Sequence, residues 1–161
     1  MKDLRLEAEG ERTIRMTRSF NAVRTAVFDA WTKPELLRRW LLGPGEHWSM
    51  PICEIDLRTG GAYRFVWRHG IDGTEMGLSG EYIEIVPPRR IVATERFDEA
   101  WYPGSAVIVT DFFEQEGITT LTQRITYDSA AARDGVLRSP MEGGVRISYD
   151  RLEELLTRKD V

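Results

Sequence analysis

Few side chains in this 161-residue chain are of the types that carry metal or nucleophilic chemistry. The chain has two histidines, His47 and His69, and one cysteine, Cys53. They form no Cys-x-x-Cys, His-x-x-x-His or His-Glu-x-x-His motif, so we expect no protein zinc site and no cofactor. The sequence also lacks the Gly-x-Ser-x-Gly motif of a nucleophile elbow. Cys53 lies on the apolar face of a predicted strand, where an inert core thiol is expected.

Acid–base chemistry without a metal would have to use His69, Tyr63 or Asp56. His69 ends the apolar face of a predicted strand, where it could be a general acid or base at a cavity mouth, or a solvated loop residue. Asp56 and Arg58 could orient a polar ligand head, or could form a solvated ion pair. A metal-free enzyme is therefore one hypothesis.

Aromatic side chains are the most informative feature of the sequence. Tyr63, Phe65 and Trp67 alternate along one predicted strand and so share a face. Trp40 and Trp48 flank the Gly-Pro-Gly turn that leads into the sheet. Such a group is typical either of an ordinary core or of an apolar pocket with few polar groups.

Hydrophobic periodicity indicates the elements that position these residues. A period of two predicts strands at 12–20, 51–58, 61–69, 76–86, 89–98, 105–114 and 118–128. Helical spacing predicts helices at about 22–31 and 129–136, a short helix that starts after Thr32 and ends near 40, and a long helix from 140 to about 158. The expected caps are Asn21, Thr32 and Ser139. Short turns between consecutive strands favour an antiparallel meander. The element order predicts an α+β fold, in which a curved seven-stranded antiparallel sheet wraps around a long C-terminal helix, with two short helices after the first strand.

Two registers are possible for the first hairpin of the meander. A two-residue loop would pair Asp56 with Phe65 and turn the carboxylates inward. A three-residue loop would pair Ile55 with Phe65 and Asp56 with Arg64, which separates apolar from polar residues and is preferred. Three further acidic residues are expected on the strand surface or at the rim: Glu81, Glu84 and Glu95.

Composition and charge exclude several classes of protein. Hydrophobic residues make up 42% of the chain and charged residues 30%, as in an ordinary globular protein, and the net charge is -4. That charge argues against nucleic-acid and membrane partners, which need a basic surface. A single thiol, no apolar leader and no apolar run of about 20 residues predict a cytoplasmic protein. We expect one domain over residues 12–158, a flexible segment at 1–11, and a monomer or homodimer.

Several stretches, taken in order, resemble a known family. They are RSFNAVRTAVFDAWTKPELLRRWLLGP, EIDLRTGGAYRF, GEYIEIVPPRRIVATERF, GITTLTQRITYDS and MEGGVRISYDRLEELL. Together they are similar to the helix-grip, START-like (SRPBCC) superfamily, and within it to the family named for the C-terminal domain of the activator of the heat-shock-protein-90 ATPase. The resemblance implies seven strands, a long C-terminal helix and a cavity between them. It also implies relatives that bind lipids or hormones, and some that are cyclases.

The residues and the resemblance together give a leading hypothesis and two alternatives. The leading hypothesis is a domain that binds a small apolar or amphipathic ligand between the sheet and the C-terminal helix. The alternatives are a co-chaperone-like or regulatory interaction domain of a stress response, with a chaperone or another protein as partner, and the metal-free enzyme. No catalytic residue is assigned. The predicted ligand-binding residues are Trp40, Trp48, Tyr63, Phe65, Trp67, His69, Trp101, Ile108, Leu121, Gln123, Ile125, Met141 and Val145.

Overall fold

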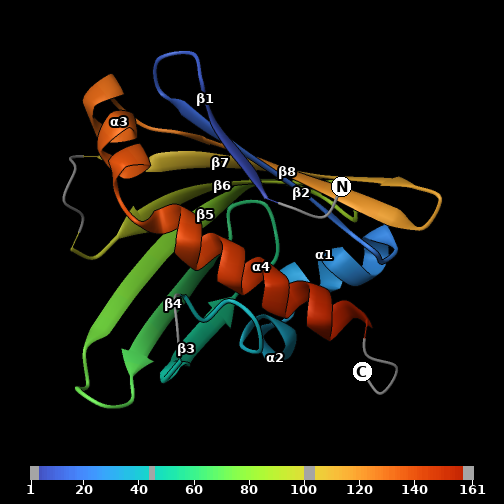
Figure 1. Ribbon diagram of the computed structural model, residues 1–161, viewed down its shortest axis with the longest axis horizontal. Coiled ribbons are helices and arrows are strands. Elements are labelled where there is room, and N and C mark those ends of the chain that lie inside the picture. Colours follow the sequence, from blue (N-terminus) through green and yellow to red (C-terminus); the bar gives the residue numbers. More distant parts are fainter. Residues whose placement is uncertain (1–3, 44–45, 100–103, 158–161) are drawn as a thin grey trace.

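Eight strands and four helices make up the fold of the computed structural model, which describes residues 4–43, 46–99 and 104–157 (Figure 1). The strands are β1 (Arg5–Glu9), β2 (Thr13–Phe20), β3 (Trp48–Ile55), β4 (Ala62–His69), β5 (Glu75–Val86), β6 (Arg90–Phe97), β7 (Ala106–Gln115) and β8 (Ile118–Thr126). The helices are α1 (Arg24–Thr32), α2 (Pro34–Leu37), α3 (Ala130–Arg138) and α4 (Met141–Thr157). In the described part of the chain, no helix is both long enough and apolar enough to cross a membrane.

The strands form one antiparallel sheet in the order β1-β2-β8-β7-β6-β5-β4-β3. The predicted α+β helix-grip architecture and its meander are confirmed, but the sheet has eight strands and not seven. The additional strand is β1, which pairs with β2 so that Leu6 lies opposite Met16 and Ala8 opposite Ile14. Part of the segment for which flexibility was expected, Arg5–Glu9, thus forms an edge strand of the sheet.

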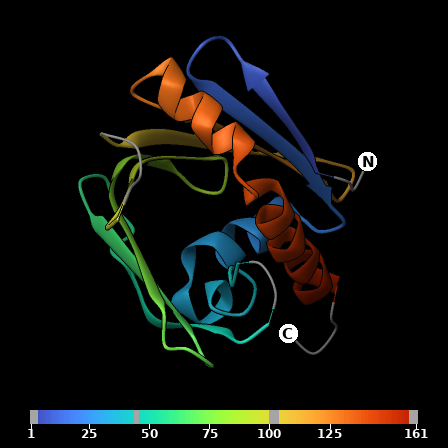
Figure 2. The ribbon, with the colours of Figure 1, turned by 60° about the vertical axis from the view of Figure 1, so that its left-hand side comes forward.

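The long helix α4 lies across the concave side of the curved sheet. In Figure 1 it crosses in front of the strands, and in Figure 2 the sheet curves around α1 and α2 and comes back toward α4. An ion pair fastens this helix to β2. Arg18 is 5% exposed, and its Nη1 donates to Oδ1 of Asp150 at 2.8 Å. The guanidinium carbon also lies 5.1 Å from the ring centre of Phe20, so the charge rests on an aromatic face.

The helix starts differ from the predicted caps. The N-cap of α1 is Val23 and that of α2 is Lys33, and neither makes a side-chain capping hydrogen bond, so Asn21 and Thr32 are not caps. The hydroxyl of Thr32 instead donates to the carbonyl of Phe28 inside α1. Ser139 likewise donates backward, to the carbonyl of Val136 in α3. Both hydroxyls thus bond a carbonyl three or four residues earlier in the preceding helix, a common local bond of Ser and Thr side chains.

The β3–β4 hairpin has a register that neither prediction gave. Ile55 lies opposite Tyr63 and Cys53 opposite Phe65, which is two residues from the preferred pairing. A shift of two keeps each side chain on its predicted face, because the side-chain period is also two. Asp56 and Arg58 consequently lie in the exposed connection, where Nε of Arg58 is 2.9 Å from Oδ2 of Asp56. Their role as a ligand-orienting pair has no support from this placement.

Candidate functional site

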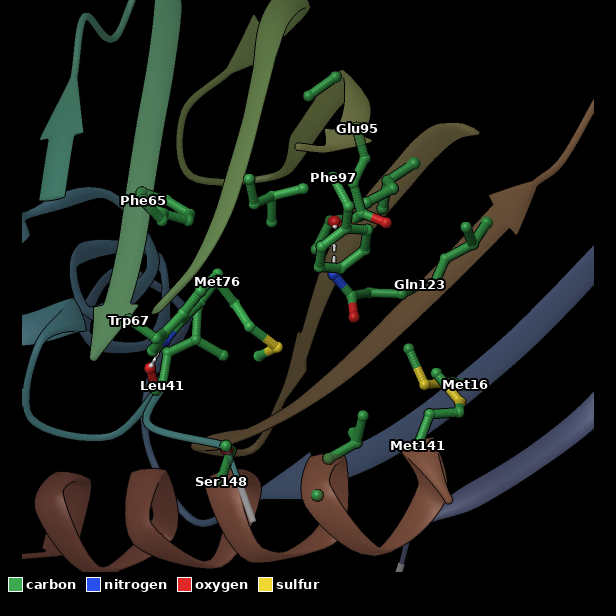
Figure 3. A pocket seen from close by; sticks show the side chains of 18 of the residues that line it. Met16, Leu41, Phe65, Trp67, Met76, Glu95, Phe97, Gln123, Met141 and Ser148 are labelled. Carbon is green, nitrogen blue, oxygen red and sulfur yellow. Dashed lines mark hydrogen bonds between the residues drawn. The ribbon is translucent and has the colours of Figure 1, made fainter. Parts of the chain in front are cut away.

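A cavity of about 560 Å³ lies between the sheet and α4. Most of its wall consists of aliphatic and aromatic side chains, which come from every layer of the fold. Figure 3 shows Phe65 and Trp67 of β4 on one wall, Gln123 and Met16 on the other, and Met141 and Ser148 of α4 facing them. Ligand sites in proteins are typically concave spaces of this size, mostly apolar with a few polar groups.

The wall at β4 follows directly from strand periodicity. Tyr63, Phe65 and Trp67 alternate along the strand, so all three face the cavity, and each is less than 9% exposed. Nε1 of Trp67 donates a 2.7 Å hydrogen bond to the carbonyl of Leu41, drawn in Figure 3. This bond fixes the segment after α2, where Leu41 also lines the cavity. The wall is therefore held in place by a polar contact as well as by packing.

A glycine gives Tyr63 room to lie across the neighbouring strand. Gly80 of β5 lies opposite Tyr63, and an added Cβ there would overlap the tyrosine ring and the carbonyl oxygen of Thr94. Because that space is free, the phenol of Tyr63 crosses β5 and donates a 2.6 Å hydrogen bond to the Thr94 carbonyl of β6. Burial raises the pKa of Tyr63 well above its ordinary value, and the charge of nearby Glu95 raises it further, so the phenol stays protonated.

A chain of three polar side chains crosses the cavity wall between α4 and β7. The hydroxyl of Tyr149 donates to Oε1 of Gln123 at 2.7 Å, and Nε2 of Gln123 donates to Oγ1 of Thr110 at 3.1 Å. All three residues line the cavity and are buried. Burial raises the pKa of Tyr149 above its ordinary value, with a smaller opposite effect of Arg18. These polar groups are thus already paired within the protein.

An aromatic cluster closes the cavity at the end near α1 and α2. Trp31 lines the cavity and meets the fully buried Trp40 edge to face, with ring centres 4.9 Å apart. Tyr149 of α4 contacts the same cluster, 6.1 Å from Trp40 and 5.8 Å from Phe20. The cluster is a solid core, so the empty space begins only on the far side of Trp31 and Tyr149.

Glu95 is the exception in this apolar wall. Ile91, Ala93, Glu95 and Phe97 alternate along β6 and all line the cavity. Figure 3 shows Glu95 extending from β6 into the same space as Phe97 and Gln123. Burial raises the pKa of Glu95 from 4.5 to about 7, because the surroundings disfavour the charged carboxylate. Glu95 was expected on the strand surface or at the rim; it is partly exposed and lines the cavity, so it does not lie on the outer face of the sheet.

The structure brings most of the predicted site residues together around the cavity, and their contact with a ligand remains a prediction. Nine line it: Trp48, Tyr63, Phe65, Trp67, Ile108, Gln123, Ile125, Met141 and Val145. Trp40, Leu121 and His69 lie elsewhere. Trp40 is buried behind Trp31, with its Nε1 bound to the carbonyl of Ala30, and Leu121 is a fully packed core residue. Trp101 falls outside the described residues.

His69 also lies away from the cavity wall. Its ring stacks edge to face on Trp48, 5.0 Å between centres, and its Nδ1 lies 3.3 Å from Oδ1 of Asp72 in the following turn. His69 is thus the last residue of β4 and contacts the wall residue Trp48 without lining the cavity itself. Within residues 4–43, 46–99 and 104–157, no group of three or more His, Cys, Asp or Glu side chains could hold a metal ion.

Sequence reasoning missed several wall residues that the structure places beside the cavity. Besides Glu95, the most consequential are Tyr149 and Trp31. The helical stripe of α4 could have revealed Tyr149, because it follows Met141, Val145 and Ser148 on one face. Trp31 carries no such signal, since nothing in its sequence neighbourhood distinguishes a wall residue from a core residue.

Comparisons with known proteins agree with this architecture. The sequence model of the family described as "Activator of Hsp90 ATPase homolog 1-like protein" matches residues 21–157. A protein from Rhodobacter sphaeroides is 29% identical, with a TM-score of 0.89 over 96% of this chain and 98% of that one. A protein from Chromobacterium violaceum is 26% identical, with a TM-score of 0.76 over 91% of this chain and 99% of that one.

A more distant structure carries a functional description of its own. A protein from Plasmodium falciparum, described as an HSP90 activator, is 22% identical, with a TM-score of 0.55 over 71% of this chain and 72% of that one. At this level of identity the likeness concerns the fold alone. A search of curated protein sequences finds no match.

Proposed function

This chain belongs to the family of Activator of Hsp90 ATPase homolog 1-like proteins, and on that premise we propose that it binds a small apolar or amphipathic ligand between the sheet and α4. The family and the helix-grip fold support a ligand-binding or co-chaperone-like domain. The observation that carries the finer proposal is the cavity of about 560 Å³ with its predominantly apolar wall.

An empty space of this size is unusual in a folded protein. Protein interiors are packed about as densely as organic crystals, and voids larger than a water molecule are few. Each unfilled volume also lowers stability, since its lining loses the contacts that a filled core would make. A cavity that is nevertheless retained in a chain with a normal hydrophobic content supports a binding role.

The wall is held open by specific bonds, which favours a preformed site. Trp67 is bonded to Leu41 at 2.7 Å and Tyr63 to Thr94 at 2.6 Å, so both rings are fixed beside the space. One part of the wall also reaches the molecular surface, because Met76 of β5 lines the cavity and is 44% exposed. A ligand would reach the space past this side chain without the sheet having to open.

The test is a pair of tryptophan substitutions on adjacent faces of α4. Val145 lines the cavity, so Val145→Trp fills it, whereas Ile147 is 39% exposed and Ile147→Trp adds the same ring at the surface. Wild type and both variants are screened by thermal shift against fatty acids, isoprenoids, sterols, fatty amines and polycyclic aromatics. A ligand at 100 times its Kd stabilises the native state by about 2.7 kcal/mol, which corresponds to several degrees for a domain of this size.

The expected result is a stabilising ligand that wild type and Ile147→Trp bind and that Val145→Trp does not. Calorimetric titration then gives the stoichiometry. Binding that is equal in all three proteins would place the ligand outside the cavity and contradict the proposal. Absence of any stabilising compound in the whole screen would also count against it.

A surface role as a co-chaperone is the second candidate, and the family match is the observation that favours it. It needs no empty cavity, so Val145→Trp should retain it. The test is the ATPase rate of the Hsp90 from the same cell with wild type and Val145→Trp added. Equal stimulation by both proteins supports this role, and no stimulation at micromolar concentration contradicts it.

A further inference from the structure

Glu95 provides the only charged side chain among the described residues that line the cavity. It comes from the middle of the inward-facing row of β6, between Ala93 and Phe97. Its cross-strand partner on β7 is Ala106, which is fully buried and offers no polar side chain. A carboxyl group thus faces an apolar space that has no basic side chain in its described wall.

No hydrogen bond or ion pair reaches the Glu95 carboxyl from any residue in the described ranges. The polar groups around it are engaged elsewhere: Tyr63 of β4 donates to the Thr94 carbonyl, Gln123 of β8 to Thr110 of β7, and Tyr149 of α4 to Gln123. Glu95 is only partly exposed, and the space that its carboxyl faces is mostly apolar. Glu95 therefore has free acceptor capacity that the fold itself does not use.

From this geometry we infer that the cavity is selective for apolar molecules that carry a basic nitrogen, with Glu95 as the acceptor of the ammonium group. The inference rests on the proposed ligand-binding function and adds the chemical class of the ligand. An ammonium ion pairs with the carboxylate and donates to it, which is the stronger, charge-assisted form of hydrogen bond.

Charge complementarity excludes the opposite class of ligand. A fatty acid would bring a second carboxylate into a space that already contains one, and the described wall holds no Lys, Arg or His to receive it. Like charges in such surroundings disfavour ionisation of both groups. An alcohol of the same length should bind with intermediate affinity, because it can donate one neutral hydrogen bond and brings no charge.

The protonation state of Glu95 determines the two pH values at which binding is compared. Its pKa is raised to about 7 by burial, so the empty cavity carries a mostly ionised carboxylate at pH 8 and a mostly protonated one at pH 5.5. Four tyrosines also line the cavity: Tyr63 of β4, Tyr82 of β5, Tyr127 directly after β8 and Tyr149 of α4. Burial raises the pKa values of Tyr63, Tyr82 and Tyr149, so these three remain neutral at both pH values. The pH dependence of amine binding consequently reports on Glu95.

The experiment compares decylamine, decanol and decanoic acid, three molecules with the same chain, below their aggregation concentrations. Kd values are measured by calorimetry with wild type, Glu95→Gln and Glu81→Gln. Glu81 is exposed on the outer face of β5, so its variant removes the same charge from the surface and controls for attraction of a cation to the acidic protein. Circular dichroism verifies that each variant is folded.

The inference predicts that wild type at pH 8 binds decylamine at least about tenfold more tightly than decanol, as expected for a charge-assisted hydrogen bond, with decanoic acid weakest. Glu95→Gln should lose this preference and Glu81→Gln should keep it. Independently of any variant, amine affinity of wild type should fall between pH 8 and pH 5.5 while decanol affinity stays constant.

Equal binding of the three molecules, or an amine preference that Glu95→Gln retains, would overturn the inference and leave the ligand-binding proposal intact. A preference for decanoic acid would overturn it in the same way. Failure of all three molecules, together with an unproductive screen of the wider ligand set, would overturn both proposals.

Discussion

The hydroxyl of Tyr149 in α4 donates a 2.7 Å hydrogen bond to the amide oxygen of Gln123 in β8, at the wall of the cavity. The amide nitrogen of Gln123 in turn donates a hydrogen bond to the hydroxyl of Thr110 in β7. One buried amide thereby joins the C-terminal helix to two strands of the sheet. Since a buried amide left without its partner is costly, this chain of bonds fixes the distance between the helix and the sheet.

Removal of the Tyr149 hydroxyl should destabilise the protein, because it leaves the amide oxygen of Gln123 buried without a partner. Tyr149→Phe keeps the ring against Phe20 and Trp40 but leaves Oε1 of Gln123 unpaired, so we expect a loss of about 1–3 kcal/mol in the free energy of unfolding. Gln123→Leu in the same background should cost less than the two single losses added. Urea unfolding of the four proteins gives the coupling energy. Strict additivity would show that the bond does not connect the helix to the sheet.

Two glycines should respond in opposite directions to the same substitution. At Gly80 an added Cβ would overlap the Thr94 carbonyl oxygen and the Tyr63 ring, so Gly80→Ala should lower stability by about 1–3 kcal/mol. At Gly143 in α4 nothing lies within 4 Å of an added Cβ. Gly143→Ala should raise stability by about 0.5–1 kcal/mol, because alanine loses less backbone entropy in a helix. Thermal or urea unfolding measures both, and a tolerated Gly80→Ala would contradict the described contact of Tyr63 with β6.

Burial of Glu95 should make the protein less stable at alkaline than at acidic pH, compared with a variant that cannot ionise. The pKa is about 7 in the folded protein against 4.5 ordinarily, so between these values the folded state holds a proton that the unfolded state has lost. Stability that Glu95 contributes at low pH is therefore lost as the pH rises from 4.5 to about 7, and the loss is constant above that.

The measurement is the difference in unfolding free energy between wild type and Glu95→Gln at several pH values. The free energy of unfolding of Glu95→Gln, relative to that of wild type, should rise by up to about 3 kcal/mol between pH 4.5 and 7.5, since one pKa unit corresponds to about 1.4 kcal/mol. The paired carboxylates Asp72 and Asp98, whose pKa values are lowered mainly by hydrogen bonds from Thr74 and Arg64, are present in both proteins and cancel in the difference. A difference that does not vary with pH would show that Glu95 is solvated.

The sequence predicted the elements well where side chains repeat with a clear period. The strand that contains Tyr63, Phe65 and Trp67 and the helix that starts at Met141 lie within a few residues of their expected bounds. Strand β1 was missed because three of its five residues, Arg5, Glu7 and Glu9, are charged and make the segment polar, although Leu6 and Ala8 alternate with them. Its pairing with β2 is a tertiary contact that a local pattern cannot reveal.

The candidate site was harder to predict because it depends on relations between elements. Glu95 does carry a sequence signal, since it occupies an apolar position in the alternation of Ile91, Ala93 and Phe97. Its charge favoured the surface interpretation, and only the packed fold shows the space that it faces. Trp40 and Trp31 lie in similar sequence surroundings, yet the first is enclosed and the second lines the cavity, because Trp40 packs behind Trp31 with its Nε1 bound to the carbonyl of Ala30.

The open sheet ends in β1 on one side and β3 on the other, and both strands are built so as not to recruit another chain. The β1 edge is short and alternates charged residues, three of them in five positions. In β3 the register shifts between Ser49 and Ile52, and Pro51 lies within that irregular stretch and has no amide hydrogen to offer. Charge, a bulge and a missing donor are the features that prevent neighbouring molecules from joining edge to edge into fibrils. A protein that keeps an unfilled apolar interior thus protects its rims against aggregation.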